Sequence, residues 1–405
     1  MADVASLRAA TQVDAVDGVV PRQVAEPETG EAFVGALAHA SRERLTTVIR
    51  GGGTKLDWGR PPSGVDVLVS TARLDRLLAH RHGDLTTTVQ SGMTLRALNA
   101  ALREHRQWLP VDSAFDTATV GGIVATNDAG PSRYRNGTPR DLVIGITLAL
   151  TDGRLIKAGG TVVKNVAGYD LGKLVSGSHG TLAGIVDVTF KLVPIPRASS
   201  TLAAAYADPE AMARDVAALA ASQIEPAAFD VWAGGSEATP YRLLLRIATS
   251  PAATEAQIAA ARALVSGESM VLSGDEEAGL WAAQIGSPWR GDAAVRLSWL
   301  PARLPLLLAL VKGIERSGDV SASLAGRVMG AGHLRLSGPA PALATAVTRL
   351  RASADVGHVV VLRAPRELKA LVDVWGPPRE SDTVVRSLKQ MFDPAGILNA
   401  GRGPV

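Results

Sequence analysis

The chain has no cysteine among its 405 residues. This absence excludes disulfide bridges, thiolate metal sites, a cysteine nucleophile and a flavin attached through cysteine. It also excludes an iron–sulfur cluster held by cysteines of this chain. An electron route through such a cluster would therefore require a second polypeptide.

Long apolar runs and strong charge are also missing. The longest apolar run, Leu306–Val311, is far too short to cross a bilayer. The segment Met1–Ser6 lacks the basic region and apolar core of a cleaved signal peptide. The formal net charge is only +3, without a Lys/Arg cluster, so no nucleic-acid partner is predicted. These features favour a cytoplasmic protein that is not transmembrane. Any association with the inner face of a membrane would be peripheral and would occur through partner proteins.

The length and the composition predict a soluble α+β protein with more than one domain. Hydrophobic residues make up 46% of the chain and charged residues 20%, as in ordinary globular proteins. Residues 1–196 contain short apolar strands separated by glycine-rich turns, and alanine-rich helices dominate after Pro196. We therefore expect a first domain over 1–196, a second over 197–378, and a tail over 379–405 that returns to the first domain.

In the second domain, a similar order of strands and helices occurs twice. Helices are predicted over 209–222, 253–265, 304–317 and 340–352, and strands over 229–232, 241–247, 294–299, 333–336 and 358–363. This order predicts two ferredoxin-like halves that form a duplicated cap, although no residue-level repeat accompanies it.

Three glycine-rich turns in the first domain carry the main chemical signal. They are Arg50–Thr54, Thr117–Gly122 and Ser176–Val186. Glycine permits positive φ and leaves backbone N–H groups accessible, which suits a pyrophosphate. The first turn fits neither a P-loop nor a Gly-x-Gly-x-x-Gly pattern, and alone it is equally typical of a flexible turn. The three together predict a dinucleotide site.

These turns and their neighbouring residues resemble a known family. The segments that carry the resemblance are Gln107–Asp112, Thr119–Asn127, Gly130–Arg133, Gly137, Arg140–Asp141, Gly159–Gly160, Val163–Asp170, Gly177–Val186 and the tail Phe392–Asn399. They are similar to the FAD-binding subunit of bacterial glycolate oxidase, in the vanillyl-alcohol-oxidase superfamily with a PCMH-type FAD-binding domain. The resemblance covers most of the first domain and the tail, while the middle of the chain is similar mainly in length and element order.

The resemblance implies a noncovalent FAD across the first domain. The matching cofactor-binding positions are Arg50, Gly51, Gly52, Gly53, Thr54, Thr119, Val120, Gly121, Gly122, Thr126, Asn127, Gly180, Thr181, Gly184, Ile185 and Asn399. Arg133 and Lys164 are the candidates for the positive charge that a reduced flavin requires. A loop salt bridge for Arg133 and a solvated surface position for Lys164 are the alternatives.

The cap contains an altered version of a motif found in related D-2-hydroxy-acid dehydrogenases. Those enzymes carry His-x-Gly-Asp-Gly-Asn-x-His, and the best counterpart here is Val328–Arg335. The glycines remain at Gly330 and Gly332, whereas His333 and Arg335 replace the asparagine and the last histidine. His333 as a base and Arg335 as a carboxylate ligand are the catalytic candidates. A solvated sheet face explains the same pattern equally well.

No metal site is predicted from the other histidines. His80 and His82 lie in one basic loop, and His39, His105 and His358 are separated from each other in the sequence. A Gly-x-Ser-x-Gly nucleophile turn is also absent.

Three hypotheses for function remain open. The favoured one is an FAD-binding subunit of a glycolate oxidase type complex, whose partners are a catalytic flavoprotein subunit and an iron–sulfur subunit. The second is a self-sufficient FAD-dependent dehydrogenase of a small 2-hydroxy acid. The third is a structural subunit without flavin, and the three intact turns disfavour it.

Overall fold

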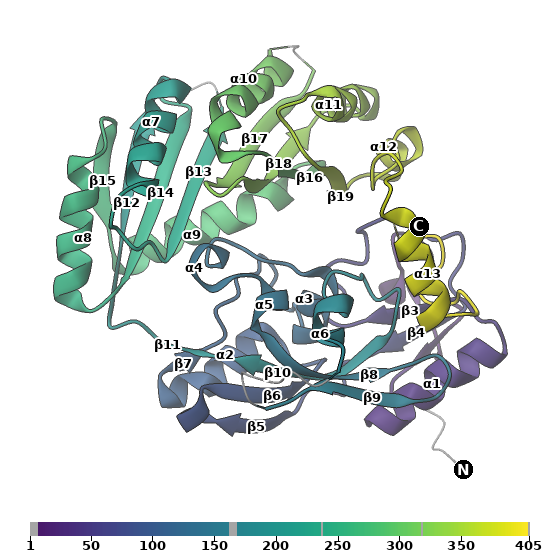
Figure 1. Cartoon of the computed structure of the whole chain (residues 1–405). Helices are drawn as coiled ribbons and strands as arrows, with labels where there is room; N and C mark the ends of the chain where they lie inside the picture. The colour runs from purple at the N-terminus through teal and green to yellow at the C-terminus, as the bar shows by residue number, and fades with distance from the viewer. Residues whose placement is uncertain (1–6, 162–167, 236–237, 317–318, 404–405) are drawn as a thin grey trace. The chain divides into compact units, whose positions relative to one another are not determined.

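The computed structural model describes residues 7–161, 168–235, 238–316 and 319–403 (Figure 1). Its contacts divide the chain into two compact units. The first unit comprises residues 1–129, 137–195 and 378–405, and the second comprises 130–136 and 196–377. The sequence analysis placed 130–136 in the first domain, but this short segment packs with the second unit instead. Lys164 lies outside the described residues.

The first unit contains a four-stranded sheet of order β1-β2-β4-β3 and a five-stranded sheet of order β5-β6-β10-β8-β9. Strands β2 and β3 run parallel to β4, whereas the five-stranded sheet is antiparallel throughout. A short pair, β7 and β11, completes the unit. The bounds are β1 (Leu7–Ala9), β2 (Gln23–Ala25), β3 (Thr47–Arg50), β4 (Val67–Ser70), β5 (Leu77–Arg81), β6 (Thr86–Gln90), β7 (Gln107–Trp108), β8 (Val143–Ala149), β9 (Leu155–Gly159), β10 (Gly184–Lys191) and β11 (Val193–Pro194).

Helix α1 (Gly30–Arg42) joins the two sheets through its apolar face. Phe33 and Leu37, one turn apart, are both fully buried. They share a core cluster with Val69 of β4 and Val186 of β10. Full burial of such a side chain adds about 1.5–3 kcal/mol to the free energy of unfolding. This apolar face therefore holds the helix against both sheets.

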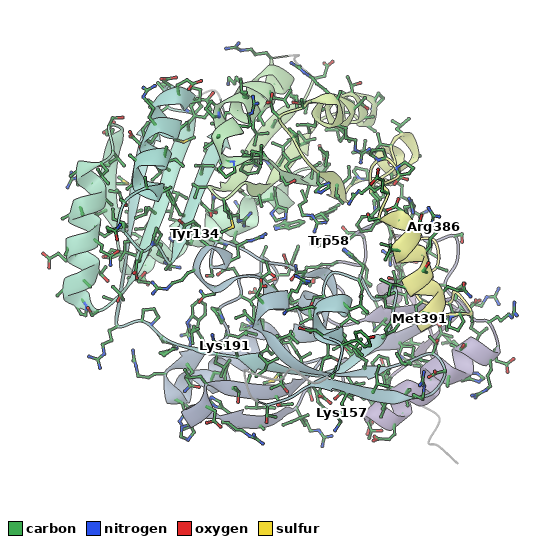
Figure 2. The ribbon with its side chains drawn as sticks, viewed as in Figure 1. Trp58, Tyr134, Lys157, Lys191, Arg386 and Met391 are labelled. Atoms are coloured by element: carbon green, nitrogen blue, oxygen red, sulfur yellow. The ribbon has the colours of Figure 1, made fainter. Side chains whose placement is uncertain are left out.

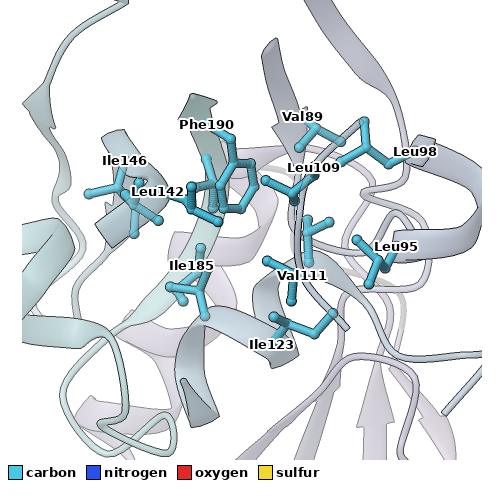
Figure 3. Close-up of a cluster of buried hydrophobic side chains, with 14 of the residues drawn as sticks. Val89, Leu95, Leu98, Leu109, Val111, Ile123, Leu142, Ile146, Ile185 and Phe190 are labelled. Carbon is cyan, nitrogen blue, oxygen red and sulfur yellow. The ribbon is translucent and has the colours of Figure 1, made fainter. Parts of the chain in front are cut away.

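A larger apolar cluster lies over the five-stranded sheet (Figure 3). Leu98 and Ile123, from two helices, pack there with Val89, Ile146 and Phe190 from three strands. The remaining helical segments of the unit are η1 (Gln12–Asp14), η2 (His82–Asp84), α2 (Leu95–Leu102), η3 (Arg103–His105), α3 (Val120–Thr126), α5 (Pro139–Leu142), α6 (Leu171–Val175) and α13 (Asp382–Phe392). The cluster anchors α3, which follows the second glycine-rich turn.

The second unit is built on an eight-stranded antiparallel sheet of order β15-β12-β14-β13-β17-β18-β16-β19. Its strands are β12 (Ala198–Tyr206), β13 (Ala228–Gly234), β14 (Tyr241–Thr249), β15 (Glu268–Leu272), β16 (Ala293–Ser298), β17 (Ser321–Arg327), β18 (Ala331–Ser337) and β19 (Val359–Arg363). Its helical segments are α4 (Arg133–Asn136), α7 (Pro209–Ala220), α8 (Pro251–Ala263), α9 (Gly274–Gly286), η4 (Ser287–Arg290), η5 (Pro301–Arg303), α10 (Leu304–Glu315), α11 (Ala340–Ala352) and α12 (Arg366–Leu371).

The element order divides this sheet into two βαββαβ halves. The first half runs β12-α7-β13-β14-α8-β15 and the second runs β16-α10-β17-β18-α11-β19. In each half the strand order in space is that of a ferredoxin-like fold, and the halves meet where β13 pairs with β17. The predicted duplication is therefore present in the structure. Strands β12, β15 and β17 were not among the predicted ones.

Candidate functional site

The first two glycine-rich turns lie in close contact with one another. A Cβ atom on Gly51 would lie 2.1 Å from Oγ1 of Thr119, and one on Gly52 would lie 1.7 Å from the carbonyl oxygen of Thr117. Side chains at these two positions are therefore sterically impossible without moving the turns apart. Gly52 and Gly53 are exposed, and among the described residues their N–H groups donate no hydrogen bond within the chain.

In the second turn, the polar side chains predicted to reach the cofactor are used within the chain. Thr119 caps α3, and its Oγ1 accepts a hydrogen bond from the N–H of Gly122 at 3.3 Å. Thr126 donates from its Oγ1 to the carbonyl oxygen of Gly122 at 2.8 Å. Asn127 ends the helix with positive φ, and its Oδ1 accepts from the N–H of Arg140. These residues therefore shape the turn, and what the turn offers a ligand is mainly backbone.

The turn itself is tightly packed against the segment between β6 and α2. Val120 is fully buried, and its N–H donates to the carbonyl oxygen of Met93 at 2.9 Å. A Cβ on Gly121 would lie 2.6 Å from Cβ of Ser91. Glycine at position 121 is therefore required by packing.

The side chain of Arg50, a predicted cofactor-binding position, forms an ion pair within the chain. Its Nη1 donates to Oδ1 of Asp14 at 2.9 Å, and Arg8 donates to both oxygens of the same carboxylate at 2.8 and 2.9 Å. Asp14 is 1% exposed. The guanidinium of Arg50 thus ties the end of β3, where the first turn begins, to the N-terminal segment.

The Asp14 cluster predicts acid-sensitive stability. Hydrogen bonds from Arg8, together with those from Thr11 and Arg50, hold the pKa of Asp14 well below its ordinary value. Because the folded-state pKa is depressed, the stabilisation is complete above the unfolded value of about 4 and is lost as pH falls below it. We expect Asp14→Asn to lower Tm by several degrees at pH 7 and to flatten the pH dependence of stability between pH 3 and 5. Thermal unfolding followed across this range tests the prediction, and equal slopes in variant and parent would contradict it.

The third turn is held by the C-terminal tail. Asn399 donates from Nδ2 to the carbonyl oxygen of His179 at 2.8 Å, and its N–H donates to the carbonyl oxygen of Thr47. Nζ of Lys389 donates to the carbonyl oxygen of Thr181 at 2.8 Å. The tail therefore returns to the glycine-rich turns, and Asn399 acts on a turn rather than as an exposed ligand. Gly180, with φ of +69°, lies beside Asn399: a Cβ there would be 3.0 Å from its Nδ2.

Two predicted positions at the end of this turn belong to the core. A Cβ on Gly184 would lie 2.6 Å from the ring of Phe33, so glycine there permits the approach of α1. Ile185 is 7% exposed and lies in the larger apolar cluster. Thr54, by contrast, is half-buried at the end of the first turn.

The three turns fit a dinucleotide cofactor through their backbone rather than through their side chains. Their glycines remove side chains where the backbones converge, and Gly52 and Gly53 present N–H groups without bulk. A pyrophosphate is bound by such donors. The fit thus rests on the backbone, because the side chains of Arg50, Thr119, Thr126 and Asn127 already bond within the chain.

In the second unit, His333 and Arg335 lie on the same face of β18. The strand alternates, with Gly332, Leu334 and Leu336 buried and the intervening side chains half-buried. His333 is opposite Arg296 of β16 and Ala325 of β17 in the sheet. Segment η4 covers this face, and the ring of Trp289 lies 5.4 Å from that of His333, centroid to centroid.

Arginines surround His333. Nη1 of Arg327 lies 3.4 Å from Nδ1 of His333. Loss of water around the imidazole, followed by the charges of Arg327, Arg296 and Arg133, holds its pKa well below the ordinary value. His333 is therefore a neutral imidazole at neutral pH, which accepts a proton but does not serve as an acid.

A buried carboxylate lies at the edge of this cluster. Asp230 is fully buried, and its Oδ2 accepts from Nε2 of Gln284 at 3.1 Å and lies 3.9 Å from Nε of Arg327. Nε of Arg335 is buried without a hydrogen-bond partner among the described residues. The face thus carries several guanidinium groups with one buried carboxylate beside them, an environment that favours an anionic ligand.

Arg133 belongs to this second unit rather than to the glycine-rich turns. It lies on α4, whose neighbour Tyr134 contacts the ring of Phe229 on β13 with centroids 5.9 Å apart. Its charge lowers the pKa of His333. The predicted role of Arg133 beside a flavin ring stays a prediction, and within the second unit the residue belongs to the arginine cluster.

His105, which is separated from His80 and His82 in the sequence, is not isolated in the structure. His80, His82 and His105 lie together, with ring centroids 4.3 to 6.2 Å apart. Their rings stack or meet edge to edge rather than converge, and no group of histidines or acidic residues in the described chain is arranged to hold a metal ion.

Sequence reasoning missed Asp14, Arg327, and a buried ion pair between Lys55 and Asp128. Lys55 directly follows the first turn and Asp128 directly follows Asn127. Their positions beside two glycine-rich turns could have indicated that they lie near the cofactor site. Asp14 and Arg327 carried no such signal, because their partners are distant in the sequence or on another strand.

Comparison with known proteins gives the first unit a cofactor. Residues 21–159 match the family described as FAD binding domain. Glycolate oxidase subunit GlcD of Bacillus subtilis (strain 168) is 34% identical over 52% of this chain and 45% of its own length. Glycolate oxidase subunit GlcE of Escherichia coli (strain K12) is 34% identical over 50% of this chain and 56% of its own length. The chain thus spans about half the length of these relatives.

Two further similarities extend over most of the chain. D-2-hydroxyglutarate dehydrogenase of Xanthomonas citri pv. viticola is 28% identical over 94% of this chain and 89% of its own length. A solved structure of alkyldihydroxyacetonephosphate synthase covers 94% of this chain and 77% of its own, with a TM-score of 0.68 and 16% identity, which shows the fold alone. The predicted PCMH-type FAD-binding fold with FAD as its cofactor is confirmed. Among the described helices, none has the length and apolar character needed to span a membrane.

Proposed function

Because residues 21–159 form an FAD-binding domain, we propose that the chain is an oxidoreductase that acts on a small 2-hydroxy acid with noncovalently bound FAD. The observation that carries the substrate class is the neutral His333 within the arginine cluster of the second unit. The names of three relatives, two glycolate oxidase subunits and a D-2-hydroxyglutarate dehydrogenase, support the same class.

Oxidation of a 2-hydroxy acid requires a base for the hydroxyl proton and a cation for the carboxylate. His333, kept neutral by its surroundings, is the proposed base for the hydroxyl proton. Arg335 is the proposed carboxylate ligand, and Arg327 holds the imidazole from the side of Nδ1. FAD, when bound, supplies a two-electron acceptor. No metal is needed in this scheme, because guanidinium groups provide the positive charge.

We further propose that the chain works as the FAD-binding subunit of a glycolate oxidase type complex. The absence of cysteine means that electrons leaving the flavin toward an iron–sulfur cluster must enter another chain. A catalytic flavoprotein subunit and an iron–sulfur subunit are the proposed partners. A cytoplasmic location, with any membrane association through those partners, accompanies this proposal.

An anaerobic visible spectrum of the purified chain tests these proposals. The chain is expected to carry the absorption of oxidised flavin, and the substrates to add are glycolate, D-lactate and D-2-hydroxyglutarate. Bleaching by one of them would establish a self-sufficient dehydrogenase. A spectrum that stays oxidised with all three, but bleaches when the partner subunits are present, would establish the role as a subunit. If partners and substrates together leave the flavin oxidised, the proposed activity is wrong.

A further inference from the structure

A buried ion pair joins the first glycine-rich turn to the second. Lys55 directly follows the first turn, and its Nζ lies 3.0 Å from Oδ2 of Asp128. Asp128 follows Asn127, which ends the helix of the second turn. The two side chains are only 7% and 9% exposed. Removing one partner of such a pair leaves a buried charge without compensation, which is far costlier than losing a surface ion pair.

Two aromatic rings enclose the same ammonium group. Nζ of Lys55 lies 5.6 Å from the ring centroid of Trp58 and 5.2 Å from that of Phe115. Phe115 precedes the second turn, and its carbonyl oxygen accepts from the N–H of Ala118. The ring of Trp58, labelled in Figure 2, lies 6.4 Å from that of His179 in the third turn. A single lysine therefore connects, directly or through one ring, all three turns.

The segment that carries Lys55 is itself fixed by the tail. The guanidinium of Arg402 donates to the carbonyl oxygens of Leu56, Trp58 and Arg60. Trp58 is 4% exposed, so its ring is packed within the unit. The ammonium group thus has a defined position relative to the glycine-rich backbone.

We propose that Lys55 and Asp128 are a positioning pair, which sets the spacing of the glycine-rich turns for FAD. The carboxylate and the two rings occupy the surroundings of the ammonium, and its low exposure leaves little access for a phosphate. The pair is neutral as a whole, so it adds no net charge beside the pyrophosphate. Its effect on the cofactor is exerted through the geometry of the turns. Because FAD binding alone is involved, this inference stands independently of the proposed hydroxy-acid activity.

Titration of flavin-free protein with FAD tests the pair, with quenching of flavin fluorescence as the measure of Kd. Lys55→Met is expected to raise Kd about 10- to 100-fold, since the turns lose their link and a lone carboxylate remains near a doubly negative ligand. Asp128→Asn should raise Kd less than Lys55→Met does, because the ammonium group of Lys55 remains beside the turns. The double variant, without either charge, should bind FAD better than Lys55→Met alone. This order distinguishes a coupled pair from two independent effects.

Matched controls separate positioning from general stability. Lys173 and Asp170 form an exposed pair in the same unit, with side chains 48% and 55% exposed, and Lys173→Met should leave Kd unchanged. Lys55→Arg, which keeps the charge, should recover part of the affinity. The Tm of each flavin-free variant is measured alongside. A wild-type Kd for Lys55→Met, whatever its Tm, would overturn the proposal.

If Lys55→Met does not fold, the neutral double variant decides the question. A Kd above that of the parent protein supports the positioning role, and an unchanged Kd refutes it.

Discussion

Replacement of Gly52 by alanine is expected to abolish FAD binding. The added Cβ would lie 1.7 Å from the carbonyl oxygen of Thr117, a backbone atom that cannot rotate away. The first two turns must therefore separate, and the converging backbone that suits the pyrophosphate is lost. A loss of at least about 100-fold in affinity is expected, which corresponds to roughly 3 kcal/mol. The flavin absorbance of the purified variant, relative to its protein absorbance, gives the result directly.

Gly35 provides the matched control for this variant. It lies in α1, and a Cβ there would meet nothing within 4 Å. Gly35→Ala should retain full flavin and gain up to about 1 kcal/mol of stability, because alanine is the better helix residue. Full flavin occupancy in Gly52→Ala would show that the contact between the turns is not needed for the cofactor.

His333→Gln is expected to lower the rate of substrate oxidation by about 100- to 10,000-fold while leaving bound FAD unchanged. Glutamine keeps a hydrogen-bonding group near Arg327 but cannot accept a proton. The flavin content is expected to stay the same because the glycine-rich turns belong to the other unit. Stopped-flow reduction of the flavin, with partner subunits present if the isolated chain is inactive, measures the effect.

The pH profile of the parent protein gives a second measure of the same residue. Because its surroundings hold the pKa of His333 well below the ordinary value, the base form predominates throughout the neutral range. The rate is therefore expected to stay level from pH 8 down to about 6 and to fall only at lower pH. His358→Gln, at an exposed histidine in the same unit, should leave rate and profile unaltered. A profile unchanged by His333→Gln would remove this histidine from the mechanism.

The duplicated cap could be predicted from element order, but three of its strands could not. Strand β12 has the sequence Ala-Ser-Ser-Thr-Leu-Ala-Ala-Ala-Tyr, and β17 is similarly rich in alanine, serine and glycine. Such residues have weak strand propensity, so these segments form strands mainly because neighbouring strands pair with them on both sides. Tertiary context, rather than local sequence, decides their conformation.

The glycine-rich turns, by contrast, could be predicted because local sequence decides their conformation. Glycine is required at Gly51 and Gly52 because the chain of the second turn approaches both residues closely, and this constraint leaves a clear mark in the sequence. The roles of Arg50 and Arg133 were not predictable. Each depends on a partner brought close only by the fold: Asp14 for the first and the His333 cluster for the second. The histidines at 80, 82 and 105 came together in the same way.

The bonds made by the tail complete the glycine-rich turns late in biosynthesis. The glycine-rich turns leave the ribosome early, but Asn399 and Arg402, which fix two of them, are separated from their partners by 220 and more than 340 residues. The whole second unit is translated in between. A nascent chain therefore lacks these bonds for most of its synthesis, and they form only after the last helix has emerged.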